Sequence, residues 1–221
     1  MTAGDTKPLV RTEMLDVRPL VMIAVPTRGT VRHELVGQML SWCNDTRVRK
    51  IFMTQMGSPC DAVRNLITER FLGSPAEFLI TVDDDNPPLR NPIDLVFEDK
   101  DVIALPTPII WESKRVTRNI YKKSGENLYD TITEKPGDQF RRVDAAGSGC
   151  LVIKRRVLEA IPAAFLCIVD PVVGKIVLGT DLAFSKRVAE AGFEMWAHFG
   201  YCCRHIQSVD LWELVESSRS Q

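Results

Sequence analysis

The sequence lacks long apolar runs. No stretch approaches the roughly 18 apolar residues that a membrane-spanning helix needs. Residues 1–7 contain no apolar core of the kind that a secretory signal carries. We therefore expect no membrane span and a protein of the cytoplasm. Internal repeats and low-complexity tracts are absent from the sequence as well.

The chain also has little net charge and no paired-cysteine motif. Its 28 Lys and Arg residues nearly balance its 29 Asp and Glu residues, so no global basic field points to a nucleic acid or a membrane surface. None of the six cysteines belongs to a Cys-x-x-Cys pair, and most have apolar neighbours, which indicates reduced and buried side chains. The adjacent Cys202 and Cys203 are a weak candidate for binding a soft metal.

What the chain does contain is an alternation of strand and helix patterns. Apolar runs predict strands at residues 20–25, 50–55, 78–82 and 101–105, and helical spacing predicts helices at residues 30–43 and 58–72. Ser58 is predicted to cap the second helix. This order predicts an α/β fold with a Rossmann-like, mostly parallel sheet and helices on both faces. We expect a flexible leader at residues 1–18 and a single domain at residues 19–221.

The second half of the sequence is less regular. Residues 106–142 have few periodic apolar groups and predict a long polar loop. A small-residue turn at residues 147–149 leads into a predicted strand, and a short helix follows at residues 155–161. A later helix is expected to open at Thr180-Asp181 and to end at Gly192, before a strand at residues 193–197.

Three consecutive carboxylates, Asp83, Asp84 and Asp85 (the Asp cluster), follow the predicted strand at residues 78–82. Adjacent carboxylates repel one another, and the usual reason to gather them at a strand end is a hard cation. Side chains alternate along an extended chain, which predicts that Asp83 and Asp85 face one site and that Asp84 points away. The alternative is a solvated acidic turn.

A second polar turn is expected at the same edge of the sheet. Pro26, Thr27 and Arg28 close the first predicted strand, as the Asp cluster closes the third. In open α/β sheets, ligands bind outside the carboxyl ends of the strands. The two turns are therefore expected to serve one site.

The order of these parts, from residue 20 to residue 208, resembles the nucleotide-sugar glycosyltransferases of the GT-A fold, especially the family 2-like type. The resemblance rests on the following pieces: Pro26-Thr27-Arg28, Arg64-Asn65, Asp83-Asp84-Asp85, Gly147-Ser148-Gly149, Gly179-Thr180-Asp181 and His205. It implies a metal-dependent, inverting transfer of a sugar from a nucleoside-diphosphate sugar, most often a UDP-sugar, to an acceptor hydroxyl. The implied cofactor is Mn²⁺ or Mg²⁺.

The resemblance also implies roles for individual residues. Asp85 would be the main metal ligand, Asp83 would assist it or bind the ribose, and His205 would be a third ligand, with His198 as the alternative. Asp181 would be the general base, although a carboxylate at this position is also a routine helix cap. The implied substrate contacts are Pro26, Thr27, Arg28, Asp61, Arg64, Asp83, Asp84, Gly147 and Ser148. The small-residue turn would let a sugar approach backbone amides, or it is a tight turn without a ligand.

Several alternatives remain open at this point. A nucleotidyltransferase also uses paired Asp residues on an α/β sheet, and a silent nucleotide-sugar-binding module would need no base. The acceptor is a glycan or, alternatively, DNA with hydroxymethylated bases. The second possibility comes from the basic segment 111–123, where basic and aromatic residues interleave: Trp111, Lys114, Arg115, Arg118, Tyr121, Lys122 and Lys123. A solvated loop is the simpler interpretation of that segment.

Overall fold

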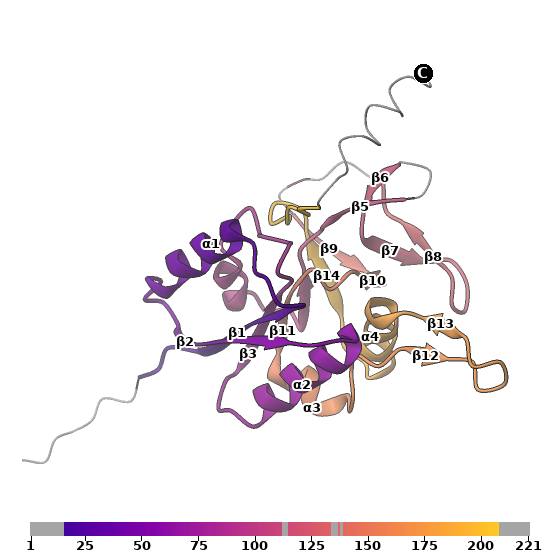
Figure 1. Cartoon of the computed structure of the whole chain (residues 1–221), viewed down its shortest axis with the longest axis horizontal. Coiled ribbons are helices and arrows are strands. Elements are labelled where there is room, and N and C mark those ends of the chain that lie inside the picture. Colours follow the sequence, from indigo (N-terminus) through magenta and orange to yellow (C-terminus); the bar gives the residue numbers. More distant parts are fainter. Residues whose placement is uncertain (1–15, 112–114, 134–136, 138, 208–221) are drawn as a thin grey trace, which may run out of the picture.

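A seven-stranded sheet runs through the centre of the protein (Figure 1). The computed structural model describes residues 16–111, 115–133, 137 and 139–207. In spatial order, the strands of the sheet are β2 (Arg49–Met56), β1 (Leu20–Thr27), β3 (Phe78–Val82), β11 (Cys150–Lys154), β4 (Val102–Ala104), β14 (Met195–His198) and β9 (Phe140–Val143). All of them run in one direction except β11 and β9, which are antiparallel to their neighbours.

Helices cover both faces of this sheet. One face packs against α1 (His33–Cys43) and the 3₁₀ helix η1 (Pro92–Phe97), and the other packs against α2 (Cys60–Leu72), α3 (Arg155–Ala160) and α4 (Thr180–Glu190). In β1, Val21 and every second residue after it pack in the core on the α1 side of the sheet. Leu20 and every second residue after it pack in the core on the α2 side. Because both faces are buried, this strand is a continuous apolar run. The predicted α/β class, with a mostly parallel sheet and helices on both faces, is confirmed.

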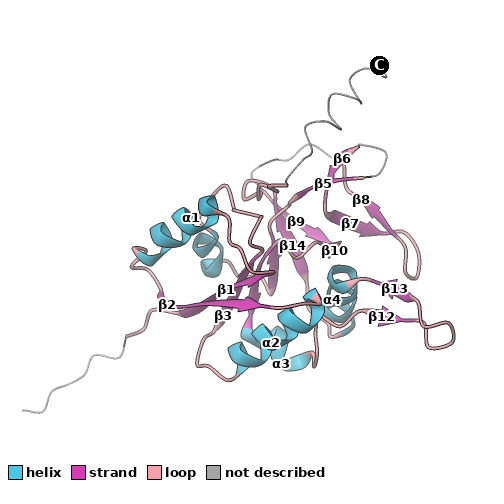
Figure 2. Cartoon of the chain, in the orientation of Figure 1, coloured by secondary structure: helices cyan, strands magenta, loops and turns pink. Residues whose placement is uncertain are grey.

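The predicted loop at residues 106–142 is wrong, because the segment is largely β structure. It contains β5 (Pro108–Ile110), β6 (Val116–Arg118), β7 (Ile120–Lys123), β8 (Tyr129–Thr131) and the beginning of β9. β5 and β6 form a hairpin, and β7 lies between β8 and β10 (Ala145–Ala146) in a separate small sheet (Figure 2). A further hairpin joins β12 (Ile168–Val169) to β13 (Ile176–Leu178). Strands of two to four residues are too short to show a clear hydrophobic period.

Strand β11 joins the sheet between β3 and β4, antiparallel to both. The small-residue turn at residues 147–149 directly precedes β11. Because Cys150, the first residue of β11, pairs with Val82, the last residue of β3, this turn lies at the end of β3. The amide of Asp83 donates to the carbonyl oxygen of Gly149 at 2.8 Å, which continues the β3–β11 pairing by one residue. The fold therefore places Ser148 and the Asp cluster at neighbouring positions of the same sheet edge.

The observed helix ends agree only partly with the predicted ones. Helix α2 begins at Cys60 with Pro59 as its N-cap and no side-chain capping hydrogen bond, so the predicted capping by Ser58 is wrong. Helix α4 begins at Thr180, as predicted, and the chain turns away through Gly192, whose φ of 82° favours glycine. Among the described residues, no helix has the length and apolar character needed to cross a bilayer. Most of the predicted leader, residues 1–15, lies outside the described residues.

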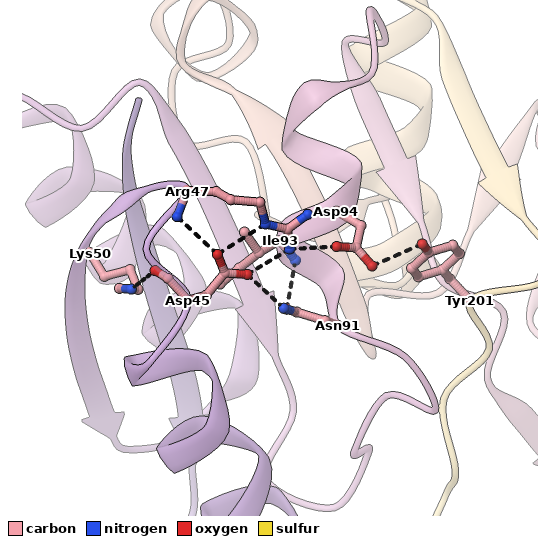
Figure 3. A network of polar contacts seen from close by, with 7 residues as sticks. All are labelled: Asp45, Arg47, Lys50, Asn91, Ile93, Asp94 and Tyr201. Carbon is pink, nitrogen blue, oxygen red and sulfur yellow. Dashed lines mark hydrogen bonds and ion pairs between the residues drawn. The ribbon is translucent and has the colours of Figure 1, made fainter. Parts of the chain in front are cut away.

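A polar network ties three separate segments together on the α1 side of the sheet (Figure 3). Arg47 Nη2 lies 2.6 Å from a carboxylate oxygen of Asp45 and 2.6 Å from one of Asp94. Asn91 Nδ2 donates to Asp45 at 2.9 Å, and the Tyr201 hydroxyl donates to Asp94 at 3.0 Å. The network links the loop before β2, helix η1 and the segment after β14. It thereby anchors the chain that leads to the predicted ligand at position 205.

Candidate functional site

A cavity of about 240 Å³ opens at the carboxyl ends of β1 and β3. It is lined by Pro26, Thr27, Arg28, Gly57, Cys60, Val63, Asp83, Asp84 and Asp85. We call it the Asp cavity. The structure thus brings together the Pro-Thr-Arg turn and the Asp cluster, as the position of both at one sheet edge predicted.

The predicted alternation of the Asp cluster is wrong. Strand β3 ends at Val82, and the next residues form a turn in which the amide of Asn86 donates to the carbonyl oxygen of Asp83 at 3.0 Å. Period-two geometry holds only along an extended chain, so it does not apply to this turn. All three Asp residues line the Asp cavity, and the carboxylate of Asp84 contacts the amide of Arg28, which lines it too.

Each carboxylate of the cluster has a different partner. Arg64 Nη2 donates to Asp83 Oδ1 at 2.5 Å, and the backbone amide of Arg28 donates to Asp84 Oδ2 at 3.4 Å. The third carboxylate, that of Asp85, has its Oδ2 3.6 Å from Nε2 of the histidine at position 205. Three separate segments of the chain therefore contact the cluster, and among these contacts Arg64 brings the full positive charge.

The ion pair between Asp83 and Arg64 is buried. The Arg64 side chain is only 2% exposed, and that of Asp83 is 25% exposed. Burial raises the pKa of Asp83 to about 6, the charge of Arg64 opposes this shift, and the charges of Asp181 and Asp85 add to it. Two buried nitrogens of Arg64, Nε and Nη1, have no hydrogen-bond partner among the described residues. Unsatisfied buried donors are costly, and Arg64 itself does not line the Asp cavity.

The ring of His205 is oriented by a backbone carbonyl. Its Nδ1 lies 2.8 Å from the carbonyl oxygen of Pro108, to which it donates in the neutral Nδ1–H tautomer. Nε2 then carries a lone pair beside Asp85. Metal-binding histidines typically donate their second ring N–H to a carbonyl or carboxylate in this way. The described residues nevertheless contain no ready-made group of three His, Cys, Asp or Glu side chains that could hold an ion.

The carboxylate of Asp181 is held by a buried serine. The hydroxyl of Ser148, which is 2% exposed, donates to Asp181 Oδ1. The N-cap of α4 is Gly179, and no side chain caps this helix, so the carboxylate does not act as its hydrogen-bonding cap. Burial raises the pKa of Tyr121 to about 12, and the negative charge of Asp181 adds to the shift. The sequence had indicated Tyr121 only as part of the basic segment.

The glycines at 147 and 149 make room for protein side chains. A Cβ on Gly147 would lie 1.9 Å from Asn119 Nδ2, and a Cβ on Gly149 would lie 2.5 Å from Asn86 Nδ2. The amide of Gly147 already donates to the carbonyl oxygen of Asn119 at 2.7 Å, so it is not free for a sugar. This geometry favours the tight-turn interpretation, and the substrate contact of Gly147 stays a prediction.

Other predicted residues lie elsewhere. Asp61 does not line the Asp cavity, and its carboxylate accepts the amide of Ala62 in its own helix at 2.9 Å. The ring of His198 packs against the rings of Phe140 and Tyr201, at centroid distances of 4.5 and 4.8 Å. The thiol of Cys202 donates to a backbone carbonyl at 3.0 Å.

Sequence reasoning missed three residues of the Asp cavity: Gly57, Cys60 and Val63. Gly57 has a φ of 155°, which favours glycine, and a glycine directly after a predicted strand was a signal that could have indicated it. Cys60 and Val63 are ordinary residues of a helical pattern, so nothing in the sequence distinguished them.

The described residues of the basic segment 111–123 are divided between separate places in the structure. Arg115 lines a cavity beside β5 and β6, whereas Lys123 lines another beside α4. Arg118 is half-buried; burial raises the pKa of the Cys202 thiol, and the charge of Arg118 has a smaller, opposite effect. Lys114 lies outside the described residues.

Comparisons with known proteins bear on the fold. No protein-family model matches the chain, and no curated protein matches its sequence. Among solved structures, A197 from STIV is similar over 85% of this chain and 86% of that chain, with 20% sequence identity and a TM-score of 0.62. This likeness shows a common fold.

Two other solved structures are more distant. Apo UDP-glucose pyrophosphorylase has 10% identity over 91% of this chain and 80% of its own, with a TM-score of 0.43. A glycosyltransferase involved in the glycosylation of the major capsid of PBCV-1 has 12% identity over 64% of this chain and 63% of its own, with a TM-score of 0.34. At these TM-scores the likeness says nothing about what this chain does.

Proposed function

We propose that this protein is a metal-dependent transferase that moves a sugar from a nucleoside-diphosphate sugar to an acceptor hydroxyl with inversion. One observation carries the proposal: the three carboxylates of the Asp cluster line a cavity together with the Pro26-Thr27-Arg28 turn. A nucleoside diphosphate brings both a planar base and clustered negative charge. The turn offers a polar surface for the first, and a cation held by the cluster would match the second.

The residues present fit a divalent cation. Asp85 Oδ2 and His205 Nε2 lie 3.6 Å apart, and in the Nδ1–H tautomer this nitrogen, which also lies 3.3 Å from Gln207 Nε2, carries a lone pair for a metal. Mg²⁺ and Mn²⁺ are commonly held by one or two protein ligands together with substrate phosphates, so a third protein ligand is not required. When bound, the cation would offset the negative charge that develops on the departing diphosphate. Arg64 does not line the Asp cavity, and its role in this proposal is to hold the carboxylate of Asp83, to which Nη2 donates.

In this proposal Asp181 is the general base. The acceptor oxygen attacks the anomeric carbon, the bond from that carbon to the diphosphate breaks, and the acceptor proton passes to Asp181. Ser148 donates to Oδ1, which fixes the carboxylate and leaves Oδ2 to receive the proton. The hydrogen bond makes Ser148 a positioning residue. The general base and the Asp cluster share one electrostatic environment, because Asp181 contributes to the pKa shifts of both Asp83 and Arg64.

A nucleotidyltransferase is the second candidate, and one observation favours it. Arg28 lies on the loop directly after the first strand and lines the Asp cavity, where such enzymes place a basic residue against a nucleoside triphosphate. The products separate the two reactions. Sugar transfer releases a nucleoside diphosphate, whereas nucleotidyl transfer to a sugar phosphate releases pyrophosphate.

The test begins with binding. We expect calorimetry to detect UDP binding in the presence of Mn²⁺ and to lose it in EDTA, and we expect Asp85→Ala to weaken Mn²⁺–UDP binding. Glu159→Gln, on α3 and 54% exposed, is the matched control and should bind normally. Binding that is unaffected by EDTA would contradict the metal assignment.

Turnover then separates an enzyme from a binding module. A panel of nucleotide sugars is screened for release of nucleoside diphosphate, and Asp181→Asn is expected to reduce turnover about 10²–10⁴-fold while donor affinity stays within a few-fold. If Asp181→Asn turns over as fast as the parent protein, Asp181 is not the general base. Pyrophosphate release from a nucleoside triphosphate would favour the second candidate.

A further inference from the structure

A second cavity lies away from the Asp cluster, between the β5–β6 hairpin and the end of β8. It has a volume of about 440 Å³ and is lined by Trp111, Arg115, Thr117, Asp130, Thr131 and Thr133. We call it the Trp111 cavity. Figure 2 shows the small strands β5, β6, β7 and β8 grouped on the side of the molecule away from α1. Its volume falls in the range typical of small-ligand sites.

The Trp111 ring is exposed but oriented. The residue is 44% exposed, its indole Nε1 donates to Thr117 Oγ1 at 2.7 Å, and its backbone amide donates to the carbonyl oxygen of Arg115 at 3.0 Å. The indole therefore has its one polar group satisfied, and its exposed surface is apolar and electron-rich. A flat surface of this kind suits a ligand that presents C–H groups on one face.

The polar lining of the cavity is mixed in charge. Arg115 can only donate hydrogen bonds, Asp130 can only accept them when ionised, and the threonine hydroxyls can do both. One cation opposite one anion gives no net charge, so the lining does not select a phosphate backbone. Sugar hydroxyls both donate and accept, and a sugar ring has an apolar C–H face. The set of side chains matches a neutral carbohydrate.

The hairpin connects this cavity to the Asp cluster. The carbonyl oxygen of Pro108, the first residue of β5, is the atom that holds His205 beside Asp85. From Pro108 to Trp111 the chain advances three residues, which in extended conformation is about 10 Å. The Trp111 cavity therefore lies about 10 Å along the chain from the carbonyl that orients His205.

We infer that the Trp111 cavity is a carbohydrate subsite that holds sugar units of the acceptor, an inference that rests on the proposed function. The acceptor is accordingly a glycan and not a hydroxymethylated DNA. The subsite binds sugar without the donor, since none of its lining residues belongs to the Asp cavity.

The experiment measures binding of neutral oligosaccharides to the full chain without any nucleotide. The panel contains malto-, cello- and manno-oligosaccharides, observed by saturation-transfer NMR and titrated by calorimetry. Trp111→Ala is expected to weaken binding about ten- to thirty-fold, because stacking area is lost, and Trp111→Phe is expected to retain most of it. Ile110→Ala is the matched control, since Ile110 directly precedes Trp111 at the end of β5, is 57% exposed and does not line the cavity.

The outcomes separate this inference from the proposed function. Mn²⁺–UDP binding and donor hydrolysis in Trp111→Ala should equal those of the parent protein, since the Asp cavity is untouched. No binding by any oligosaccharide of the panel, or equal binding by Trp111→Ala, overturns the subsite even if donor turnover is intact. A single-stranded oligonucleotide that binds in place of the sugars, and loses affinity in Trp111→Ala, overturns it in favour of nucleic acid. If the parent protein does not bind Mn²⁺–UDP, this result counts against the proposed function and not against the subsite.

Discussion

Replacing Asp45 by Asn should destabilise the protein in a pH-dependent manner. The carboxylate is 9% exposed, accepts hydrogen bonds from Arg47 and from Asn91, and lies in the network of Figure 3. The side-chain hydrogen bond from Arg47 is the main cause that lowers the pKa of Asp45 from 3.8 to about 2. At about 1.4 kcal/mol per pH unit, this shift corresponds to about 2 kcal/mol of stability at pH 7.

The sign of the pH dependence follows from the lowered pKa. The stabilising contribution of Asp45 is fully present above its unfolded pKa of 3.8 and is lost as the pH falls through about 2. At pH 3 about half of it should remain. The difference in free energy of unfolding between the parent protein and Asp45→Asn is therefore expected to be about 2 kcal/mol at pH 7 and about 1 kcal/mol at pH 3.

Urea unfolding followed by tryptophan fluorescence measures this difference at a series of pH values. Asp99→Asn is the control. Asp99 also forms an ion pair, in its case with a lysine, but its side chain is 96% exposed, and an exposed ion pair contributes little to stability. A difference for Asp45→Asn that is the same at pH 3 and pH 7 would refute the electrostatic argument. So would a loss of stability no larger than that of the control.

Two further predictions follow from buried contacts. Gly147→Ala should prevent normal folding, because its Cβ would lie 1.9 Å from Asn119 Nδ2, whereas Gly179→Ala has nothing within 4 Å and should melt like the parent protein in a thermal scan. Arg64→Met should lower the free energy of unfolding by about 3–5 kcal/mol at pH 7 in urea titrations, since it leaves the charge of Asp83 without its partner. The loss should be smaller at pH 5, where Asp83, with a pKa raised to about 6, is largely protonated; an equal loss at both pH values would contradict this explanation.

The first half of the fold could be predicted because several of its elements are long. Strands β1 and β2 have eight residues each and α2 has thirteen, so hydrophobic pattern alone indicated them. The strands of residues 106–142 have three or four residues and pair with one another, so their stability comes from neighbours that a local pattern does not contain. Strand β11 was predicted as a strand, but its place between β3 and β4 depends on long-range pairing.

The site was predictable in its location and less so in its geometry. Both segments follow the carboxyl ends of predicted parallel strands, and this alone was sufficient to expect the Pro26-Thr27-Arg28 turn beside the Asp cluster. The prediction that Asp83 and Asp85 face one site while Asp84 points away was wrong, because a turn replaces the extended chain after Val82. The Ser148–Asp181 contact joins residues 33 positions apart, and no local signal in the sequence reports such a pair.

The insertion of β11 between β3 and β4 has a consequence for synthesis on the ribosome. Strands β1 to β4 emerge from the exit tunnel before β11 has been translated, and β3 and β4 are not hydrogen-bonded neighbours in the finished sheet. Until then β3 has one unpaired edge and β4, whose partners β11 and β14 both follow it in the chain, has two. Unpaired edges are the kind of surface on which nascent chains associate wrongly or bind chaperones. The amide of Asp83 has its partner only when Gly149 arrives, and His205 reaches Asp85 later still. Nascent chains that stall before residue 150 should therefore bind neither metal nor nucleotide.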